Sequence, residues 1–368
     1  MAEETISFAR GAPSADILPA EAVREAAARA LESDWQRALS YGTGAGHPGL
    51  REWIAELHEV GPEQVMVTNG SMEAASMLFR HFVGDGDRVL VEQPTYDRTL
   101  LLLNQAGAEI APARLEEDGV DVSAVEAACT ESPLRLAHLI PNFHNPAGCT
   151  LSAAKRRRLV ELAAEHGFVL FEDDPYRLIG FEETESETMH GMDEAGRVIH
   201  ASSFSKTVSP GVRVGYLVGP EEEIAALAKR GSENYISPNM LAESIVLELC
   251  RSGALERNIE LVNAELAGRR DALVAALEEK IPEAGFVVPA GGYFLWLDLE
   301  DDVDTERLLE QAKQEGVTFV AGPDFMLEGG RSSLRLSFAP VTTEQIPEGI
   351  DRLARALERL RSSERAAA

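Results

Sequence analysis

Lysine is scarce in this chain of 368 residues, and one lysine stands in an unusual context. Lys206 follows the run 198–205, in which apolar residues give way to small hydroxyl residues. Open α/β sheets bind their ligands at the carboxyl ends of strands, which is where this lysine would stand. A partly desolvated amine loses proton affinity and can attack an aldehyde. From the spacing alone, a surface lysine remains an equally good interpretation.

The other lysines have ordinary surroundings. Lys155 lies in an Ala-Lys-Arg-Arg-Arg run at the expected exposed start of a helix, and Lys229, Lys280 and Lys313 lie on charged helical stretches. A solvated cation is the usual state of lysine in such places. Lys206 is therefore the candidate for a catalytic amine.

A second cluster of chemically useful residues ends another apolar run. Residues 169–176 read Val-Leu-Phe-Glu-Asp-Asp-Pro-Tyr, with Tyr176 three positions after Asp173. A carboxylate at a strand end can pair with a protonated ring nitrogen, and the tyrosine can donate to an oxygen on the same ring. Adjacent carboxylates also suit a hard cation, so a metal site or a capped turn is the alternative.

A third segment has features that favour the binding of an anion. Residues 65–73 read as a strand, a glycine turn and a helix that opens at Ser71. Unpaired amides at a helix N-terminus bind phosphate well, although serine is also an ordinary helix cap. Ser203 and Arg213 flank Lys206 and could offer a hydroxyl and a guanidinium to the same anion.

The elements that must position these residues alternate along the chain. Short apolar runs predict buried strands at 64–68, 88–91, 136–140, 168–171, 198–201 and 215–218, and helical patterns separate several of them, for example at 72–82 and 153–166. Buried strands separated by helices indicate an α/β domain with a mainly parallel sheet. Long amphipathic helices are expected at 239–251 and 255–280, and 291–360 alternates strands and helices in α+β fashion.

We therefore expect three parts: an N-terminal arm at 1–39 that joins the smaller domain, a large domain at 40–240, and a small C-terminal domain at 241–368 that includes an interdomain helix. The tail 361–368 is expected to fray.

Composition excludes several classes of protein. No run reaches the roughly 18 apolar residues that a membrane span needs. The net charge of −28, from 62 acids against 34 bases, argues against general nucleic-acid binding, which needs a basic face. The acidic surface could reflect a high-salt habitat or simply aid solubility. Three cysteines without a CxxC pair indicate a reducing, cytoplasmic compartment.

Taken in order, the motifs resemble one family. The sequence is similar to the fold-type I pyridoxal-phosphate aminotransferases of class I/II, and within them to the subgroup of 2-aminoadipate and kynurenine aminotransferases. Single pieces are common, but the ordered set is specific and covers nearly the whole chain. The matching segments are 7–13, 40–44, 68–71, 92–96, 141–148, 172–176, 203–213, 291–296 and 334–338. The resemblance implies an aspartate-aminotransferase-like fold, with a large coenzyme-binding domain whose sheet is sandwiched by helices.

The resemblance also implies a role for each matching residue. Lys206 would hold pyridoxal 5′-phosphate as an internal aldimine and later move a proton between the substrate Cα and the coenzyme. Asp173 would keep the pyridinium nitrogen protonated, so that the ring can accept electrons. Tyr176 and Asn145 would contact the ring hydroxyl, and Tyr96 would stack on the pyridine face.

The phosphate would be held by Gly70, Ser71, the Met72 amide, Ser203 and Arg213. Tyr41 matches a residue that the family supplies to that phosphate from the neighbouring subunit, which implies a homodimer with shared active sites.

For the substrate, the resemblance implies that Arg335 clamps the α-carboxylate, aided by Asn145 and the Gly11 backbone. The alternative for Arg335 is a strand-end salt bridge. Arg10 replaces a small residue often seen beside Gly11 and could reach an acidic or polar substrate side chain, or else be a surface arginine over the cleft mouth.

The implied reaction moves an amino group from an L-α-amino acid to a 2-oxo acid, with 2-oxoglutarate as the family default and ping-pong kinetics. β-Elimination, cyclisation or oxidation on the same fold is the alternative. Related modules occur fused to DNA-binding domains, but the likeness begins by residue 7 and the charge is unsuitable, so we expect no nucleic-acid partner. We also expect no membrane partner and no metal.

Three further positions depart from the family pattern. Met72 and Glu73 stand where glutamines are common, so Glu73 would have to turn away from the phosphate. His47 stands where relatives tend to carry an aromatic residue, so a side-chain preference should not be copied from them.

Overall fold

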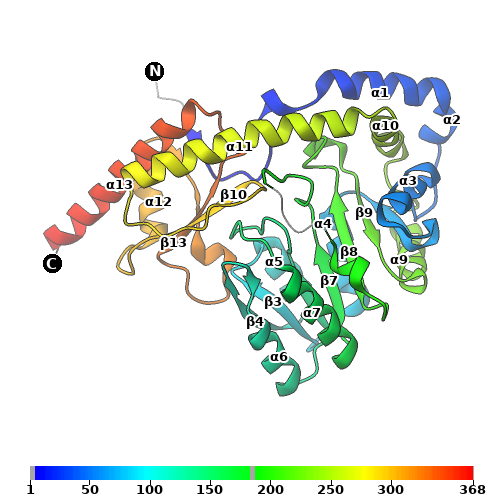
Figure 1. Cartoon of the computed structure of the whole chain (residues 1–368), viewed down its shortest axis with the longest axis horizontal. Helices are drawn as coiled ribbons and strands as arrows, with labels where there is room; N and C mark the ends of the chain where they lie inside the picture. Colours follow the sequence, from blue (N-terminus) through cyan, green and yellow to red (C-terminus); the bar gives the residue numbers. More distant parts are fainter. Residues whose placement is uncertain (1–4, 183–186, 368) are drawn as a thin grey trace.

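The structure is a computed structural model, and it describes residues 5–182 and 187–367. Within these ranges an eight-stranded sheet forms the centre of the larger lobe, in the order β2-β9-β8-β7-β6-β3-β4-β5 (Figure 1). Its strands are β2 Val65–Thr68, β3 Arg88–Gln93, β4 Glu109–Glu116, β5 Gly119–Val120, β6 Leu136–Leu139, β7 Val169–Asp173, β8 Val198–Ser203 and β9 Gly215–Val218.

The sheet is mainly parallel, as predicted. Strands β4, β3, β6, β7 and β8 run parallel to their neighbours in this order, whereas β9 is antiparallel to β2 and β8, and β5 is antiparallel to β4. The six predicted strands are confirmed within two residues at each end, and β4 and β5 were not predicted. Strand β4 alternates exposed and buried residues and contains Pro112, so it lacks the continuous apolar run of a buried strand.

Helices cover both faces of this sheet. The helices of the chain are α1 Ala20–Ser33, α2 Trp35–Ala38, α3 Pro48–His58, α4 Ser71–Phe82, α5 Asp97–Gln105, α6 Val122–Glu131, α7 Ala153–His166, α8 Met189–Met192, α9 Glu221–Tyr235, α10 Met240–Arg251, α11 Ala254–Lys280, α12 Thr305–Gln314 and α13 Gln345–Ala367. Because side chains alternate along a strand, Phe171 of β7 packs with α4, α5 and α9, while Leu170 packs on the opposite face with α6, α7 and α8. The sandwich expected for an aspartate-aminotransferase-like fold is present.

A smaller lobe lies at the other end of the molecule (Figure 1). Here β10 Phe294–Asp298, β13 Ser333–Ser337 and β12 Val320–Ala321 form an antiparallel sheet, and β1 Ile6–Ser7 pairs in parallel with β11 Val317–Thr318. Helices α11, α12 and α13 pack on these strands, and Phe8 and Ile17 of the N-terminal arm join the same core. Short 3₁₀ turns stand at Ala15–Ile17, Pro62–Gln64, Pro210–Val212 and Gly322–Phe325. The exact domain limits stay a prediction.

Two sequence-based expectations are wrong. The tail was expected to fray from residue 361, but α13 continues to Ala367, and Arg361 donates to Glu283 at 2.7 Å and to Glu300 at 2.8 Å. Lys155 was expected to be an exposed cation, but its side chain is only 16% exposed because Glu116 and Asp118 pair with it.

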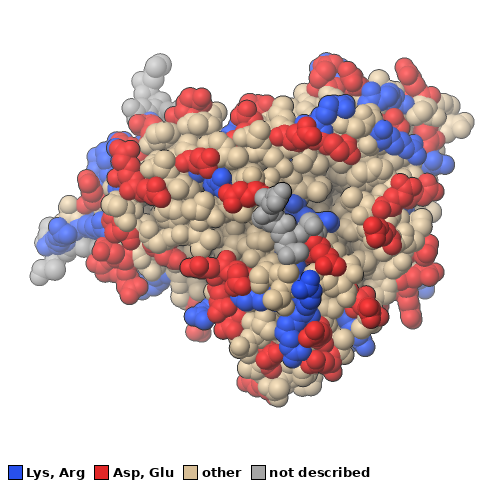
Figure 2. Space-filling view, viewed as in Figure 1, with Lys and Arg blue, Asp and Glu red and all other residues tan. Residues whose placement is uncertain are grey.

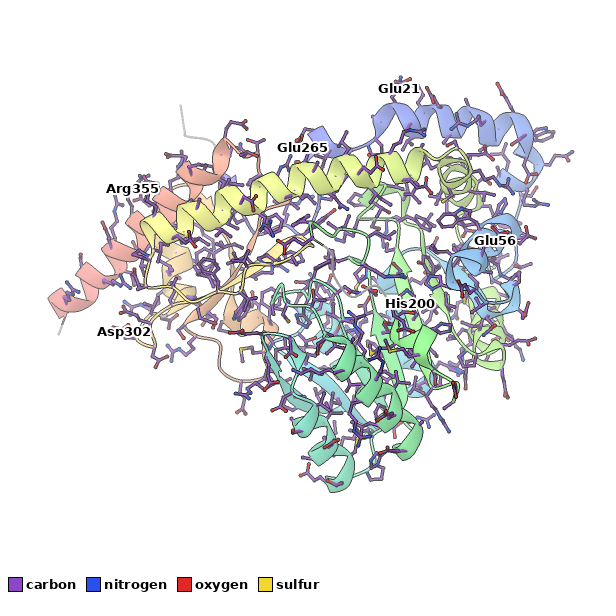
Figure 3. The ribbon with its side chains drawn as sticks, viewed as in Figure 1. Glu21, Glu56, His200, Glu265, Asp302 and Arg355 are labelled. Carbon is purple, nitrogen blue, oxygen red and sulfur yellow. The ribbon has the colours of Figure 1, made fainter. Side chains whose placement is uncertain are left out.

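The surface carries the acidic excess. Figure 2 shows Asp and Glu side chains spread over the visible face of both lobes. Figure 3 shows Glu21, Glu56 and Glu265 on the outer sides of their helices, whereas His200 lies within the larger lobe, and it is buried. Among the described residues no helix is long and apolar enough to cross a membrane.

Candidate active site

A cavity of about 160 Å³ lies at the carboxyl ends of the parallel strands. Strand β7 ends there at Asp173 and β8 ends at Ser203, so the topology brings together segments that are far apart in sequence. Nine of the predicted site residues line the cavity: Ser71, Met72, Tyr96, Asn145, Asp173, Tyr176, Ser203, Lys206 and Arg213.

The amine of Lys206 is enclosed at one side of this cavity. Its Nζ donates a hydrogen bond to the carbonyl oxygen of Gly11 at 2.8 Å and lies 5.1 Å from the ring centroids of both Tyr176 and Tyr293. Burial lowers the pKa of Lys206 to about 8, and the nearby cations Arg335 and Arg213 contribute to this lowering. About one tenth of this amine is therefore uncharged at pH 7, far more than for an ordinary lysine.

Tyr293 is a neighbour of the amine that sequence reasoning missed. Its hydroxyl donates to the carbonyl oxygen of Lys206 at 3.1 Å, and its ring packs edge-on against Tyr176 with centroids 5.4 Å apart. Tyr293 belongs to a matching motif, but it lies 87 positions from Lys206, and no spacing rule joins the two. The contact fixes the backbone that carries the amine.

Asp173 places one carboxylate oxygen against a histidine and leaves the other free. Its Oδ2 lies 3.3 Å from Nε2 of His138, which is fully buried on β6. Its Oδ1 is buried and has no hydrogen-bond partner among the described residues. A buried acceptor without a hydrogen bond costs free energy, so a hydrogen bond from a ligand to this oxygen would be favourable. His138 was not predicted as a site residue, since its strand position signals only burial.

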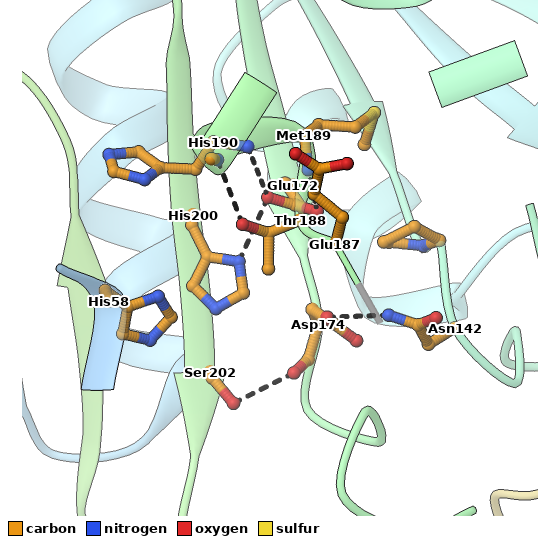
Figure 4. A network of polar contacts seen from close by, with 12 residues as sticks. His58, Asn142, Glu172, Asp174, Glu187, Thr188, Met189, His190, His200 and Ser202 are labelled. Atoms are coloured by element: carbon orange, nitrogen blue, oxygen red, sulfur yellow. Dashed lines mark hydrogen bonds and ion pairs between the residues drawn. The ribbon is translucent and has the colours of Figure 1, made fainter. Parts of the chain in front are cut away.

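The two carboxylates beside Asp173 belong to a separate network on the side of the sheet where α8 lies (Figure 4). Glu172 accepts from the backbone amides of Met189 and His190 at 2.8 and 3.1 Å, and it lies 3.1 Å from Nδ1 of His200. Asp174 accepts from Asn142 at 2.8 Å, and burial raises its pKa to about 6.

Glu172, Asp174 and His200 offer ligand atoms within 4.8 Å of one another, a set that differs from the three adjacent carboxylates of the metal alternative. The alternation of β7 separates this trio from Asp173, so the three adjacent carboxylates do not form one site. The donors on Glu172 already occupy both of its oxygens.

The turn before α4 lies at the end of the cavity where Ser71 and Met72 line it. Gly70 has φ +88° and precedes the first helical residue, Ser71, and no side chain caps this helix. A Cβ at Gly70 would lie 2.3 Å from Nη2 of Arg213, so only glycine lets the guanidinium approach the turn. The amides of Ser71 and Met72 therefore stand beside a fixed positive charge.

Glu73 turns away from this end, as predicted. Its carboxylate accepts from the backbone amide of Asn69 at 2.7 Å and from the Asn69 side-chain amide at 3.0 Å. The negative charge is thus directed back to the preceding turn, and the cavity side of the helix N-terminus stays free of it.

Arg335 stands on β13 of the smaller lobe and points at the same site. Its Nη1 donates to Oδ1 of Asn145 at 2.8 Å and its Nη2 donates to the Ala9 carbonyl at 2.7 Å, while Nε is buried without a partner among the described residues. The rings of Phe294 and Phe325 lie 4.3 and 4.8 Å from its guanidinium carbon. No ion pair with a described acid was found, which removes support for the salt-bridge alternative.

The predicted site residues that do not line the cavity include Gly70 and Arg335, described above, and three more residues, Tyr41, Arg10 and Gly11. Tyr41 is 84% exposed, and Arg10 is also exposed. Gly11 reaches the site through its carbonyl oxygen, which accepts from Lys206. His47 is buried at the start of α3, where Nδ1 accepts from the Leu50 amide at 3.4 Å.

Comparison with known proteins explains this arrangement. The family model for aminotransferase class I and II matches residues 3–353. The chain belongs to the class I and II aminotransferases. A 2-aminoadipate transaminase of Thermus thermophilus is 36% identical over 362 residues, which cover 96% of this chain and 90% of that protein.

Two solved structures are equally similar to this aminotransferase in fold. The kynurenine aminotransferase of Pyrococcus horikoshii has a TM-score of 0.93 at 32% identity, covering 97% of this chain and 92% of that chain. The α-aminoadipate aminotransferase LysN of Thermus thermophilus, complexed with N-(5′-phosphopyridoxyl)-L-leucine, has a TM-score of 0.93 at 33% identity, covering 98% and 94%. The predicted subgroup is confirmed.

The cavity of this aminotransferase fits pyridoxal phosphate, its predicted cofactor. A buried amine of lowered pKa suits the aldehyde, the free Oδ1 of Asp173 suits a protonated ring nitrogen, and the turn at Gly70 with Arg213 suits the phosphate. The three features lie around one cavity. The protein is thus a pyridoxal-phosphate-dependent transaminase.

Proposed function

We propose that this transaminase moves the amino group of an L-α-amino acid to a 2-oxo acid, with 2-oxoglutarate as acceptor, in a ping-pong reaction. The observation that carries the proposal is the enclosed amine of Lys206 in one cavity with the unsatisfied Oδ1 of Asp173. When bound, pyridoxal phosphate supplies an aldehyde that condenses with amines and a ring that accepts electrons.

Lys206 is the group we propose to hold the coenzyme and to move the proton at the substrate Cα. Its lowered pKa of about 8 supports both tasks, because the uncharged amine is the form that attacks an aldehyde and accepts a proton. The rings of Tyr176 and Tyr293 flank the amine, each with its centroid 5.1 Å from Nζ.

Asp173, Tyr176, Asn145 and Tyr96 are proposed to orient the ring. The negative Oδ1 of Asp173 would hold a proton on the ring nitrogen, and His138 would keep that carboxylate in place. Burial, with Tyr96 and Tyr293 nearby, raises the pKa of Tyr176 well above its usual value, so its hydroxyl stays a hydrogen-bond donor.

Gly70, Ser71, Met72, Ser203 and Arg213 are proposed to bind the phosphate. They surround the start of α4, where amides and the helix dipole favour an anion.

Arg335 is proposed to bind the substrate α-carboxylate together with Asn145 and the Gly11 backbone. A guanidinium offers a planar set of donors that matches a carboxylate. Its buried Nε has no described partner and Asn145 already touches Nη1, so the clamp is oriented before a substrate arrives.

We further propose a homodimer in which Tyr41 completes the partner's phosphate site. Tyr41 and Leu39 are 84% and 64% exposed and line a surface hollow with Asn239. The amide of Asn239 donates to Oδ1 of Asn69 at 3.2 Å, so the hollow adjoins the turn that precedes Gly70. Exposed aromatic surface beside an anion site is what a shared interface would cover.

A cytoplasmic location is part of the same proposal. Cys129, Cys149 and Cys250 are free thiols, all of them buried, which supports a reducing compartment.

The experiment is an amino-donor screen of the coenzyme-loaded protein, with 2-oxoglutarate or pyruvate as acceptor. We expect 2-oxo acid formation, parallel double-reciprocal lines, and complete loss in Lys206→Ala. Covalent attachment of the coenzyme at Lys206, fixed by borohydride and located by peptide mass spectrometry, is the second measurement. Release of pyruvate and ammonia from a β-substituted amino acid without any acceptor, with no amino transfer, would contradict the proposal and favour an elimination enzyme.

A further inference from the structure

A buried carboxylate–imidazole pair lies directly beside Asn145 in the chain. Glu92 on β3 and His144 are 1% and 0% exposed, and neither lines the cavity. Oε2 of Glu92 lies 3.0 Å from Nε2 of His144, and the same oxygen accepts from the backbone amide of Ile140 at 2.8 Å. One carboxylate oxygen therefore joins β3 to two points of the loop that follows β6.

The hydrogen bonds of His144 assign the proton of its ring. The backbone amide of Ala147 donates to Nδ1 at 3.2 Å, so Nδ1 is the acceptor and carries no proton. The proton of the neutral ring is then on Nε2, which donates to Glu92. Both ring nitrogens are thus occupied, one by β3 and the other by the turn that contains Asn145.

Backbone hydrogen bonds close the same turn. The amide of His144 donates to the Cys149 carbonyl at 2.9 Å, and the amide of Gly148 donates to the His144 carbonyl at 2.7 Å. Asn145 lies inside this turn and lines the cavity, and its Oδ1 accepts from Nη1 of Arg335 at 2.8 Å. The orientation of the Asn145 side chain, and through it that of the guanidinium, therefore depends on the position of His144.

A second buried contact holds the loop two residues earlier. Asn142 is 1% exposed, and its Nδ2 donates to Oδ2 of Asp174 at 2.8 Å. Because this contact does not involve Glu92, the loop should stay attached to the larger lobe when Glu92 is changed. Loss of Glu92 should therefore misplace Asn145 rather than unfold the chain.

We propose that Glu92 is a positioning residue of this transaminase: by holding His144, it fixes Asn145 for the coenzyme ring and for the substrate α-carboxylate. The inference rests on the proposed function, which gives Asn145 both of these contacts. A hydrogen bond to an ionised oxygen is stronger than one to a neutral oxygen, so a carboxylate fixes the imidazole more firmly than an amide would.

Two measurements on the coenzyme-loaded protein report on Asn145 without turnover. The first is the pH midpoint of the change in coenzyme absorbance, because a hydrogen-bond donor to the ring hydroxyl favours its ionised form and lowers that midpoint. The second is the Kd of butyrate, a monocarboxylate without an amine, measured by calorimetry. Glu92→Leu removes the acceptor, so the midpoint should rise by about 0.5 pH unit or more and the Kd about five-fold or more.

Two further variants and a control accompany it. Glu92→Gln keeps an oxygen that can accept from His144, so it should recover most of both changes. His144→Phe keeps a ring but removes both nitrogens, so it should act in the same direction as Glu92→Leu, and it carries the test if the leucine variant does not fold. The control is Glu315→Gln in the smaller lobe, where a side chain only 9% exposed accepts from Nε of Arg355 at 3.1 Å. This control should affect stability alone.

A double-variant cycle with Asn145→Ala separates positioning from a general loss of stability. If Glu92 acts through Asn145, Glu92→Leu should change the midpoint and the butyrate Kd far less in the Asn145→Ala protein than in the unmodified protein. Full additivity would overturn the inference, and so would a Glu92→Leu protein in which only the thermal midpoint changes. Failure of every amino donor to change the coenzyme absorbance of the unmodified protein would instead contradict the proposed function.

Discussion

The carboxylate of Asp173 meets the imidazole of His138 across two parallel strands, with Oδ2 3.3 Å from Nε2. His138 is itself packed edge-on against Phe79 and Phe171, with ring centroids 5.9 and 5.1 Å away. These rings pack against the imidazole, which holds the carboxylate by one oxygen, while the other oxygen is buried without a described partner.

We expect Asp173→Asn to lower kcat by on the order of a hundred-fold, because a neutral amide cannot keep a ring nitrogen protonated. His138→Phe should lower kcat much less, since the carboxylate remains but loses its support. The absorbance of the bound coenzyme reports the environment of the ring, and it should change in Asp173→Asn more than in His138→Phe. Equal effects of the two substitutions would argue that Asp173 acts only through packing.

The pH dependence of coenzyme attachment should follow the amine of Lys206. Burial and the charges of Arg335 and Arg213 lower its pKa to about 8, so the reactive uncharged form increases as pH rises through that value. In the coenzyme-free protein, we expect the attachment rate to increase from about pH 6.5 and to level off above about pH 9. Arg213→Gln removes one cation and should move the midpoint upward. A rate that keeps rising towards about pH 10.5 would show that the amine is not perturbed.

Gly70→Ala should weaken coenzyme binding in a way that a matched glycine does not. Both Gly70 and Gly86 have positive φ, at +88° and +80°, but a Cβ at Gly70 meets Arg213 whereas a Cβ at Gly86 meets nothing within 4 Å. Each alanine should cost on the order of 1–3 kcal/mol of stability through backbone strain at positive φ. Only Gly70→Ala should also raise the Kd of pyridoxal phosphate, by about ten-fold or more, in a titration of the coenzyme-free protein. Equal affinities in the two variants would contradict the phosphate site proposed at this turn.

Glu243→Gln should stabilise the protein at high pH. Glu243 on α10 is almost fully buried, its Oε1 has no described partner, and burial raises its pKa from 4.5 to about 8. Between these two values the folded state holds a proton that the unfolded state releases, so stability falls as pH rises through this window. The substitution removes that loss, and the thermal midpoint should exceed that of the unmodified protein by more at about pH 8 than at about pH 5. Glu25→Gln, on an exposed site of α1, should show no such difference.

Much of the larger lobe could be predicted from the sequence because its strands are buried on both faces. A continuous apolar run such as 215–218 has one strong interpretation, and β9 matches it residue for residue. Strand β4 has one half-exposed face and a proline, and its signal is correspondingly weak. The start of α4 was predicted closely, since a glycine turn followed by Ser71 is a local signal.

Contacts made across the fold could not be predicted in the same way. Neither the hydrogen bond from Tyr293 to Lys206 nor the pairing of His138 with Asp173 follows from any spacing in the chain. The ion pairs of Lys155 likewise depend on β4 and the turn after it, which place two acids beside α7. Such contacts arise from sheet order and lobe packing, which single-sequence patterns do not encode.

Helix α11 spans about 40 Å at about 1.5 Å per residue and is shared by two hydrophobic cores. Its first turns, with Ala254 and Leu255, pack beside the large sheet, while Val262, Leu266 and Leu273 pack within the smaller lobe. Melting of either core would strip this helix of a large share of its apolar contacts. The two lobes should therefore denature in one cooperative calorimetric transition rather than as independent units.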